Sequence, residues 1–308
     1  SLGVRKGETL GLVGESGCGK SVTAHSIMRL LPKRVAKIAE GEIMFRRQNG
    51  DIVDMTKIDP SGALIRDIRG NEIAMIFQEP MTSLSPLHTI GDQIMETIML
   101  HQKVDKKEAE ERAIEVLTAV RIGNARQIIR SFPHQYSGGM RQRAMIAMAL
   151  VCNPSVLVAD EPTTALDVTI QAQILDLMRR LQTDFQAAII MITHNLGVIN
   201  EMADRVAVMY LGKIVEIADR RTLFKHPAHP YTVGLMQSVP AMGRTDRKRL
   251  HPIPGMIPDP FNVPQGCAFY PRCPATKTEA CLNPAGVPLI EVEPGHQVRC
   301  TLYQGAGQ

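Results

Sequence analysis

The chain carries Gly14-Glu15-Ser16-Gly17-Cys18-Gly19-Lys20-Ser21, which matches the phosphate-binding loop pattern G-x-x-x-x-G-K-S/T. The apolar residues Leu10, Leu12 and Val13 precede it and predict a strand that leads into the loop. Such glycines let successive backbone N–H groups converge on phosphate oxygens, and a helix that starts near Lys20 adds the positive end of its dipole. The Lys20 ammonium supplies a point charge, and the Ser21 hydroxyl is a ligand for Mg²⁺. The loop by itself predicts nucleotide binding.

A second segment supplies acidic groups. Residues 156–161 read Val-Leu-Val-Ala-Asp-Glu, and four successive apolar residues are typical of a strand buried on both faces of a parallel sheet. Asp160 and Glu161 then stand at its carboxyl end, where α/β sheets place their ligands. Asp160 is suited to bind Mg²⁺, and Glu161 to polarise an attacking water as general base. Two acids can also simply solvate a strand end, but with the phosphate loop they predict an ATPase of α/β fold.

The order of the remaining motifs carries a family resemblance. Gln78 lies in Phe-Gln-Glu-Pro, residues 136–142 read Tyr-Ser-Gly-Gly-Met-Arg-Gln, Ala165-Leu166-Asp167 follows the acidic pair, and His194 lies in Ile-Thr-His-Asn. Together with the phosphate loop and the acidic pair, these motifs resemble, over nearly the whole chain, the nucleotide-binding subunit of an ABC transporter. The resemblance implies an α/β P-loop NTPase core, an ABC-type ATPase, with a helical subdomain.

The resemblance also implies a role for each motif. Gln78 is expected to contact Mg²⁺ and the attacking water and to sense the membrane subunit, and His194 to contact the γ-phosphate. A lone Gln or His is more often an ordinary surface or core residue, so both roles rest on order and context. Asp167 matches the family's D-loop, and we expect it to be one of the nucleotide-binding residues.

The signature residues Ser137, Gly138 and Gly139 precede a run rich in Ala and Met, from Gln142 to Leu150. This run predicts a helix whose N-terminus is a phosphate site, although Ser-Gly-Gly can also be a plain helix cap. In the family this site faces the γ-phosphate held by the partner's phosphate loop, so that ATP is sandwiched between two subunits.

Some features depart from the family pattern. Tyr136 stands where leucine is commonest in the family, and Met140 where glutamine is commonest. How tightly this signature binds the partner's ATP therefore stays open. Only 13 residues precede Gly14, whereas the family places two strands and an adenine-stacking aromatic residue upstream. We therefore expect a truncated chain with an incomplete sheet edge and weak ATP binding. Restoring upstream residues should tighten binding, since one aromatic stack contributes about 1 kcal/mol.

Composition agrees with a multi-element α/β protein. The chain has 308 residues, 44% hydrophobic and 21% charged, which is enough to bury a large core. Its net charge of +4 and its lack of Trp give no sign of a nucleic-acid surface, and we expect no nucleic-acid partner. The sequence as given contains no run of 18 apolar residues and no signal-peptide pattern. Membrane association is therefore expected through partners, at the cytoplasmic face of the cell membrane.

The periodicity and the proline content along the chain predict two regions. Residues 1–230 are assigned to the ABC ATPase domain, with a helical subdomain at about 80–150, where residues 105–120 show helical spacing. Residues 188–193 predict another buried strand, and residues 205–217 a hairpin that turns at Leu211-Gly212. Of the 20 prolines, 13 lie in residues 227–294, so residues 231–308 are expected to form a small, irregular extension rich in Cys and Pro.

Three segments indicate which group of ABC transporter ATPases the chain resembles. They are Glu79-Pro80-Met81-Thr82-Ser83-Leu84-Ser85-Pro86, His229-Pro230-Tyr231-Thr232, and residues 266–274, Gly-Cys-Ala-Phe-Tyr-Pro-Arg-Cys-Pro. They resemble the dipeptide/oligopeptide importer ATPases. The resemblance implies a second ABC ATPase as heterodimer partner, two membrane-spanning permeases and an extracytoplasmic solute-binding protein. Nickel importers share the pattern, so that solute stays an alternative.

Four of the six cysteines, Cys267, Cys273, Cys281 and Cys300, fall in the last 42 residues. A reducing compartment disfavours disulfides, and four thiolates in a region with little core suit a metal site. Their spacing is not the paired C-x₂-C pattern of zinc ribbons, and several members of the resembled family carry a 4Fe-4S cluster here. A 4Fe-4S cluster is the favoured ligand, with Zn²⁺ or unligated thiols as alternatives.

The expected mechanism follows from the resemblance. Two ATP molecules close a dimer of ATPases, closure passes through the region of Gln78 to the permeases, and hydrolysis at Glu161 reopens the dimer. A competing class is a non-transport ABC ATPase of DNA repair or translation. Those proteins usually carry two cassettes or long insertions, whereas this chain has one set of motifs.

Overall fold

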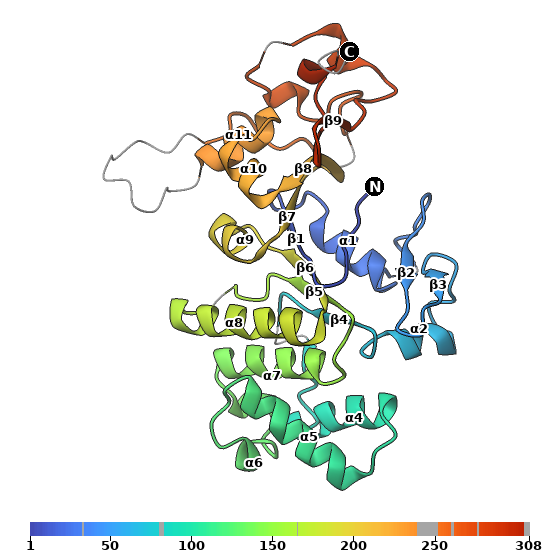
Figure 1. The fold of residues 1–308 in the computed structure, drawn as a ribbon, viewed down its shortest axis with the longest axis vertical. Coiled ribbons are helices and arrows are strands. Elements are labelled where there is room, and N and C mark those ends of the chain that lie inside the picture. Colours follow the sequence, from blue (N-terminus) through green and yellow to red (C-terminus); the bar gives the residue numbers. More distant parts are fainter. Residues whose placement is uncertain are drawn as a thin grey trace. The chain divides into compact units, whose positions relative to one another are not determined.

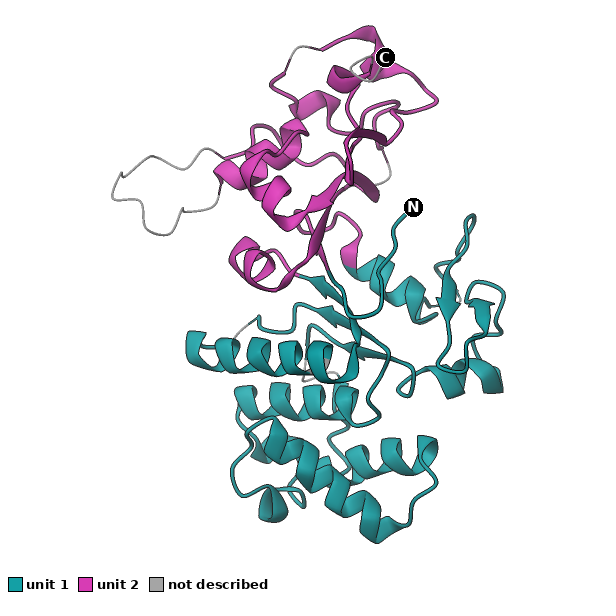
Figure 2. Cartoon of the chain, in the orientation of Figure 1, with its two compact units in different colours: residues 1–9, 21–192 teal, residues 10–20, 193–308 magenta. Residues whose placement is uncertain are grey.

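The computed structural model describes residues 1–32, 34–79, 83–164, 166–238, 252–259, 262–275 and 277–304. The chain divides into two compact units, drawn in two colours in Figure 2. Unit 1 comprises residues 1–9 and 21–192, and unit 2 comprises residues 10–20 and 193–308. Pro80, Met81 and Thr82, within the segment after Gln78, and Ala165 of the D-loop lie outside the described residues.

Unit 1 contains three parallel strands, β4 (Ile73–Ile76), β5 (Val156–Asp160) and β6 (Ala188–Ile192). Strand β5 lies between the other two, with Ile76 paired to Ala159 and Asp160 paired to Ile192. Nearly every residue of the three strands is buried, as continuous apolar runs require when both faces of a parallel sheet are covered. The strands expected at 156–161 and 188–193 are thus confirmed.

Helices dominate the middle of unit 1, as the sequence predicts (Figure 1). They are α4 (Ile90–His101), α5 (Lys106–Ala119), α6 (Ala125–Ile128), η1 (Pro133–Gln135) and α7 (Gly138–Leu150). Local capping sets where they begin, because Thr89 accepts a hydrogen bond from the Asp92 amide and Asp105 accepts one from the Glu108 amide. Buried Ile94, Ala113 and Ala147, among others, form the core between these helices.

The rest of unit 1 flanks the strands. It consists of α1 (Lys20–Ile27), the antiparallel pair β2 (Met44–Arg46) and β3 (Ile52–Asp54), α2 (Ala63–Ile68) and α8 (Val168–Phe185). Helix α1 follows the phosphate loop directly, so the strand, loop and helix order expected from the sequence is observed.

Unit 2 contains a mixed sheet in the order β1-β7-β8-β10-β9. Strand β1 (Thr9–Val13) pairs in parallel with β7 (Arg205–Tyr210), which forms the expected hairpin with β8 (Lys213–Asp219). Leu211 and Gly212 make the turn with positive φ angles of 43° and 77°. Beyond β8 the sheet continues with two strands that the sequence analysis did not predict, β10 (His296–Val298) and β9 (Ile290–Glu293).

The remaining elements of unit 2 are short. They are α9 (Leu196–Met202), α10 (Arg220–Lys225), α11 (Pro230–Gln237), η2 (Tyr270–Arg272), η3 (Glu279–Leu282) and η4 (Thr301–Tyr303). Single 3₁₀ turns joined by loops are what a proline-rich segment permits, because Pro lacks the N–H that longer helices need. In the described part of residues 231–308, the regular elements are α11, short 3₁₀ turns and the β9–β10 hairpin.

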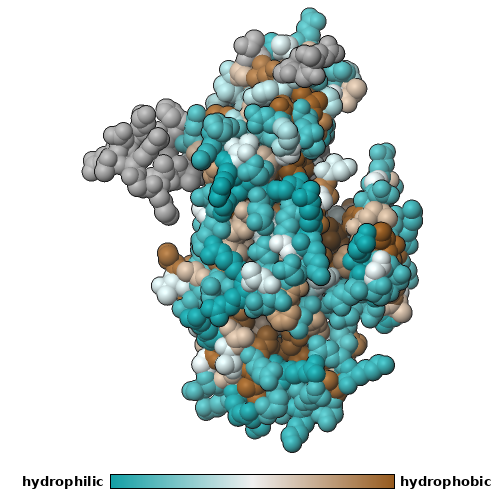
Figure 3. Space-filling view, in the orientation of Figure 1, coloured by the Kyte–Doolittle hydropathy of each residue, from teal (hydrophilic) through white to brown (hydrophobic). Residues whose placement is uncertain are grey.

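The surface is mostly hydrophilic in the view of Figure 3, with apolar residues in small separate patches. None of the helices in the described residues has the length and apolarity needed to span a bilayer.

Candidate functional site

The phosphate loop folds around its own lysine. Lys20 is 8% exposed, and its ammonium donates hydrogen bonds to the carbonyl oxygens of Gly14, at 2.8 Å, and of Glu15, at 3.0 Å. The Cys18 thiol lies 3.7 Å from the same nitrogen, and burial raises its pKa. The cation therefore stands at the centre of the loop, where a point charge for phosphate oxygens is required.

Gly14 is required by a close approach of two backbone segments. A Cβ atom at this position would lie 2.2 Å from the Met209 carbonyl oxygen of β7. The amide of Gly212, at the β7–β8 turn, donates a 2.7 Å hydrogen bond to the Cys18 carbonyl. The turn expected at Leu211-Gly212 thus supports the loop, a role that the sequence pattern did not reveal.

The acidic pair lies at the carboxyl end of β5 in unit 1. Asp160 is 3% and Glu161 8% exposed, so both carboxyl groups are buried. Glu161 has a positive φ of 51°, which is rare for a residue with a side chain and is concentrated at functional sites. Its amide donates to the Ile192 carbonyl at 2.8 Å, and its carboxylate accepts a hydrogen bond from the Thr164 hydroxyl. The backbone and the side chain of Glu161 are both fixed by neighbours.

Gln78 and His194 are exposed residues that follow strands. Gln78 comes two residues after β4, the strand paired in parallel with β5, so unit 1 brings it to the strand edge that also carries Asp160 and Glu161. His194 comes two residues after β6 but belongs to unit 2, as does the phosphate loop up to Lys20, whereas Ser21 belongs to unit 1.

The signature forms the start of α7 in unit 1. Ser137 is the N-cap, with its side chain accepting from the Met140 amide, and Ser137 and Gly138 are exposed while Tyr136 is buried. Burial raises the Tyr136 pKa to about 12, and its hydroxyl donates to the Ile128 carbonyl at 2.9 Å. Further along the helix, the Gln142 side chain donates to the Pro162 carbonyl at 2.6 Å, which joins α7 to the segment after Glu161. Asp167 has the same capping role at α8, where it accepts from the Ile170 amide.

The four C-terminal cysteines line a single pocket in unit 2, together with Phe269, Tyr270 and Leu302. Burial raises the pKa of Cys267 and of Cys300. Burial also opposes ionisation of Cys281, but hydrogen bonds with Thr301 and Thr278 outweigh it and lower its pKa. Within the described residues, no group of three or more His, Cys, Asp or Glu side chains is close enough to hold a metal ion.

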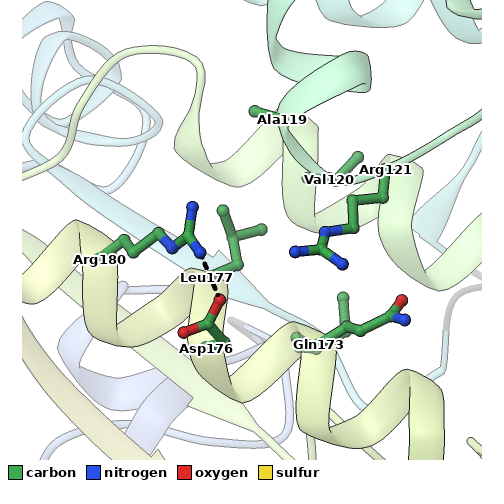
Figure 4. A pocket seen from close by; sticks show the side chains of 8 residues that line it. Ala119, Val120, Arg121, Gln173, Asp176, Leu177 and Arg180 are labelled. Carbon is green, nitrogen blue, oxygen red and sulfur yellow. Dashed lines mark ion pairs between the residues drawn. The ribbon is translucent and has the colours of Figure 1, made fainter.

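Another pocket lies between the end of α5 and helix α8 in unit 1 (Figure 4). Figure 4 shows Arg121 pointing into it from the α5 side and Arg180 ion-paired with Asp176 on α8, at 2.9 Å. None of the motif residues lines it, and its volume of about 20 Å³ has room for about one water molecule. It is a packing gap and not a nucleotide site.

Comparison with known proteins identifies the family. A family model described as ABC transporter matches residues 1–164, and one described as Oligopeptide/dipeptide transporter, C-terminal region matches residues 215–281. The chain belongs to the ABC transporter ATPases with this C-terminal region. The ATPase resembles a peptide import ATP-binding protein of Brucella melitensis, with 53% identity over 306 residues that cover 98% of this chain and 89% of the relative.

Two further relatives agree. The oligopeptide transport ATP-binding protein AppD of Bacillus subtilis is 50% identical over 305 residues, which cover 99% of this chain and 90% of that protein. The ATP-binding cassette MJ0796, solved as a dimer in a post-hydrolysis state with ADP and phosphate, matches with a TM-score of 0.62 at 27% identity, over 71% of this chain and 88% of that one. The ATPase is thus the subunit of a dipeptide/oligopeptide ABC importer that the sequence predicts, and the non-transport alternative is not supported.

Sequence reasoning missed residues outside the motifs that touch the phosphate loop. Tyr231 and Arg272 of the C-terminal region both contact Glu15. The segments 229–232 and 266–274, which only marked the subfamily in the sequence, contain these two residues and were the one signal that could have pointed to them.

Proposed function

We propose that this ATPase binds MgATP through the phosphate loop, hydrolyses it with Glu161 as general base, and thereby powers peptide uptake by two permeases. Lys20 and the loop amides hold the phosphates, while Ser21, Asp160 and Gln78 serve Mg²⁺ and the attacking water. His194 contacts the γ-phosphate. The observation that carries the proposal is the loop itself, in which the buried Lys20 ammonium is held by the Gly14 and Glu15 carbonyls.

The setting of Glu161 supports its role as general base. A positive φ at a residue with a side chain costs about 1–3 kcal/mol and persists only where the surroundings impose it. Here the Ile192 carbonyl and the Thr164 hydroxyl hold the residue, so its carboxylate has one orientation. A fixed carboxylate at the end of a buried strand is suited to orient a water molecule.

The exposed signature supports a dimeric mechanism. Ser137 and Gly138 present the N-terminus of α7 to solvent, where a second subunit's γ-phosphate can reach it. The MJ0796 cassette is a dimer in its solved structures, and we propose a dimer for this ATPase, with a second, related ATPase as partner. Asp167, which matches the D-loop, is counted with the nucleotide-binding residues of this dimer, and its carboxylate caps α8.

The remaining partners follow from transport. We propose that the ATPase acts with two permeases and an extracytoplasmic solute-binding protein, the partners that the family resemblance implies, and that it binds the permeases at the cytoplasmic face of the inner membrane. The functional boundary proposed near residue 230 separates the ATPase domain from the C-terminal region.

We also propose that the C-terminal pocket holds a 4Fe-4S cluster. What supports this part is the chemistry of the donor set, because four thiols line one pocket and thiolates are the usual ligands of such clusters. Zn²⁺, which thiolates also bind, stays the alternative. The cluster would stabilise the fold of the C-terminal region, and its ligands would be Cys267, Cys273, Cys281 and Cys300.

Reconstitution tests the proposed function. The ATPase is assembled in vesicles with its permeases and supplied with binding protein and either a peptide or Ni²⁺. We expect ATP hydrolysis to rise only with peptide, and Lys20→Ala to abolish it. Stimulation by Ni²⁺ alone would assign the other solute class, and hydrolysis unaffected by Lys20→Ala would refute the site. Iron and sulfide analysis of anaerobically purified protein, against Cys273→Ser/Cys281→Ser, tests the cluster separately.

A further inference from the structure

We propose that Arg272 and Tyr231 are positioning residues for the phosphate loop, which they hold through Glu15, so that the C-terminal region sets the affinity for ATP. The proposal rests on the proposed role of the loop in binding phosphate. Both residues belong to unit 2 together with residues 14–20 of the loop.

Arg272 holds the side chain of Glu15. Its two terminal nitrogens lie 2.8 and 3.1 Å from the two carboxylate oxygens, which is the parallel, two-point geometry of an arginine–carboxylate pair. The Arg272 side chain is only 4% exposed, and that of Glu15 is 23% exposed. The Glu15 hydrogen bonds raise the pKa of Arg272 further above its ordinary value. A largely buried pair of this kind fixes one geometry, because separating the charges leaves the guanidinium uncompensated.

The guanidinium is itself held in place. Its Nε donates to the Pro254 carbonyl at 3.1 Å, and a terminal nitrogen lies 3.4 Å from the Tyr210 hydroxyl. The rings of Tyr210 and Phe269 each lie 5.9 Å from its central carbon. Arg272 is thus a rigid support and not a mobile surface arginine.

Tyr231 holds the backbone of the same residue. The amide of Glu15 donates a 2.9 Å hydrogen bond to the Tyr231 hydroxyl oxygen. Tyr231 is fully buried near the start of α11, and its ring packs at 4.7 Å from Tyr210 and at 5.4 Å from Phe269, measured between centroids. The hydroxyl therefore stands at a fixed point against the beginning of the loop.

Glu15 links these contacts to Lys20, the lysine of the phosphate loop. Its amide is bound by Tyr231, its carboxylate by Arg272, and its carbonyl accepts a hydrogen bond from Lys20. Every polar group of this variable loop position is thereby engaged, and the bonds to its amide and to its carboxylate come from the C-terminal region. A shift of Glu15 would move the carbonyl that orients the Lys20 ammonium. Small displacements of a charge that binds phosphate are costly, because the geometry of the site is what binding depends on.

The test is MgATP affinity of the full chain, measured with a fluorescent ATP analogue, and the KM and kcat for ATP in the assembled importer. We expect Arg272→Gln and Glu15→Gln each to weaken binding about tenfold, since each removes a charge-assisted hydrogen bond. The double variant should be no weaker than the weaker single variant, because the two changes break one interaction. Arg272→Lys should restore part of the affinity. KM should rise while kcat changes little.

Matched controls come from the same region. Arg299 is a tail arginine that donates to the Ile214 and Val287 carbonyls, and Tyr303 donates its hydroxyl to the Ala228 carbonyl, so neither bonds to the loop. Arg299→Gln and Tyr303→Phe should leave ATP affinity unchanged, whereas Tyr231→Phe should weaken it. Normal affinity in Arg272→Gln and Glu15→Gln, or an equal loss in Arg299→Gln, would overturn the inference. Lys20→Ala separates the claims: normal affinity in that variant would refute the proposed function itself.

Discussion

Glu216 offers a sharp test of how the C-terminal region is attached in unit 2. This residue lies on β8 with no exposed surface, and its carboxylate accepts three hydrogen bonds of 2.8 Å, from the amides of Ala228 and His229 and from Nε2 of His296 on β10. One side chain therefore joins β8, the start of α11 and strand β10. Replacement by Gln keeps the shape but turns one acceptor oxygen into a donor.

The magnitude follows from these contacts. The substituted amide side chain would have one oxygen to offer where three donors converge, so at least one charge-assisted hydrogen bond is lost, at about 1.5–3 kcal/mol. A donor would also face a donor, and we expect Glu216→Gln to lower the free energy of unfolding by about 3 kcal/mol. For a chain of this size that corresponds to a fall of roughly 5 °C in the melting temperature.

Circular dichroism on heating provides the assay. Glu293→Gln on β9 is the matched control, because that carboxylate is exposed, and an exposed substitution changes stability by less than about 0.5 kcal/mol. Equal melting temperatures for the two variants would refute the reasoning.

Three further predictions can be checked independently. Gly14→Ala should lower MgATP affinity more than about tenfold in a binding titration, because its Cβ would lie 2.2 Å from the Met209 carbonyl oxygen, whereas Gly3→Ala, with open space around it, should have no effect. Tyr136→Phe should cost about 1 kcal/mol in urea unfolding, since it removes the hydrogen bond to the Ile128 carbonyl. Burial lowers the pKa of His229 from 6.5 to about 4 and its ring accepts the Tyr231 amide, so its contribution to stability is complete above pH 6.5 and lost as pH falls towards 4. The stability lost over this pH range amounts to about 3 kcal/mol. His229→Asn keeps an acceptor at the helix cap, so the free energy of unfolding of this variant should depend less on pH between 6.5 and 4.

Local patterns predicted much of the fold. The phosphate loop, the buried strands at β5 and β6, the β7–β8 hairpin and the helices of residues 90–150 all follow from periodicity, glycines and caps that act within a few residues. Strands β9 and β10 were missed because they have only four and three residues, and the pairing of β10 with β8 and of β9 with β10 stabilises them more than their own sequence does.

The contacts around the loop could not be predicted in the same way. Arg272 and Glu15 are 257 residues apart, and an ion pair at that separation leaves no periodic trace in a single sequence. Tyr231 and Glu216 likewise bond across the fold to backbone amides, which carry no side-chain signature. The motif residues themselves were identified because their chemistry requires fixed residue types at fixed spacing.

The most direct test of the central claim is ATP turnover by Glu161→Gln in the assembled importer. The variant keeps the size and the positive-φ backbone of Glu161 but lacks the carboxylate that polarises water, so ATP binding should persist while turnover falls by about 100-fold or more. Turnover at the wild-type rate would contradict the assignment of Glu161 as general base and with it the proposed mechanism.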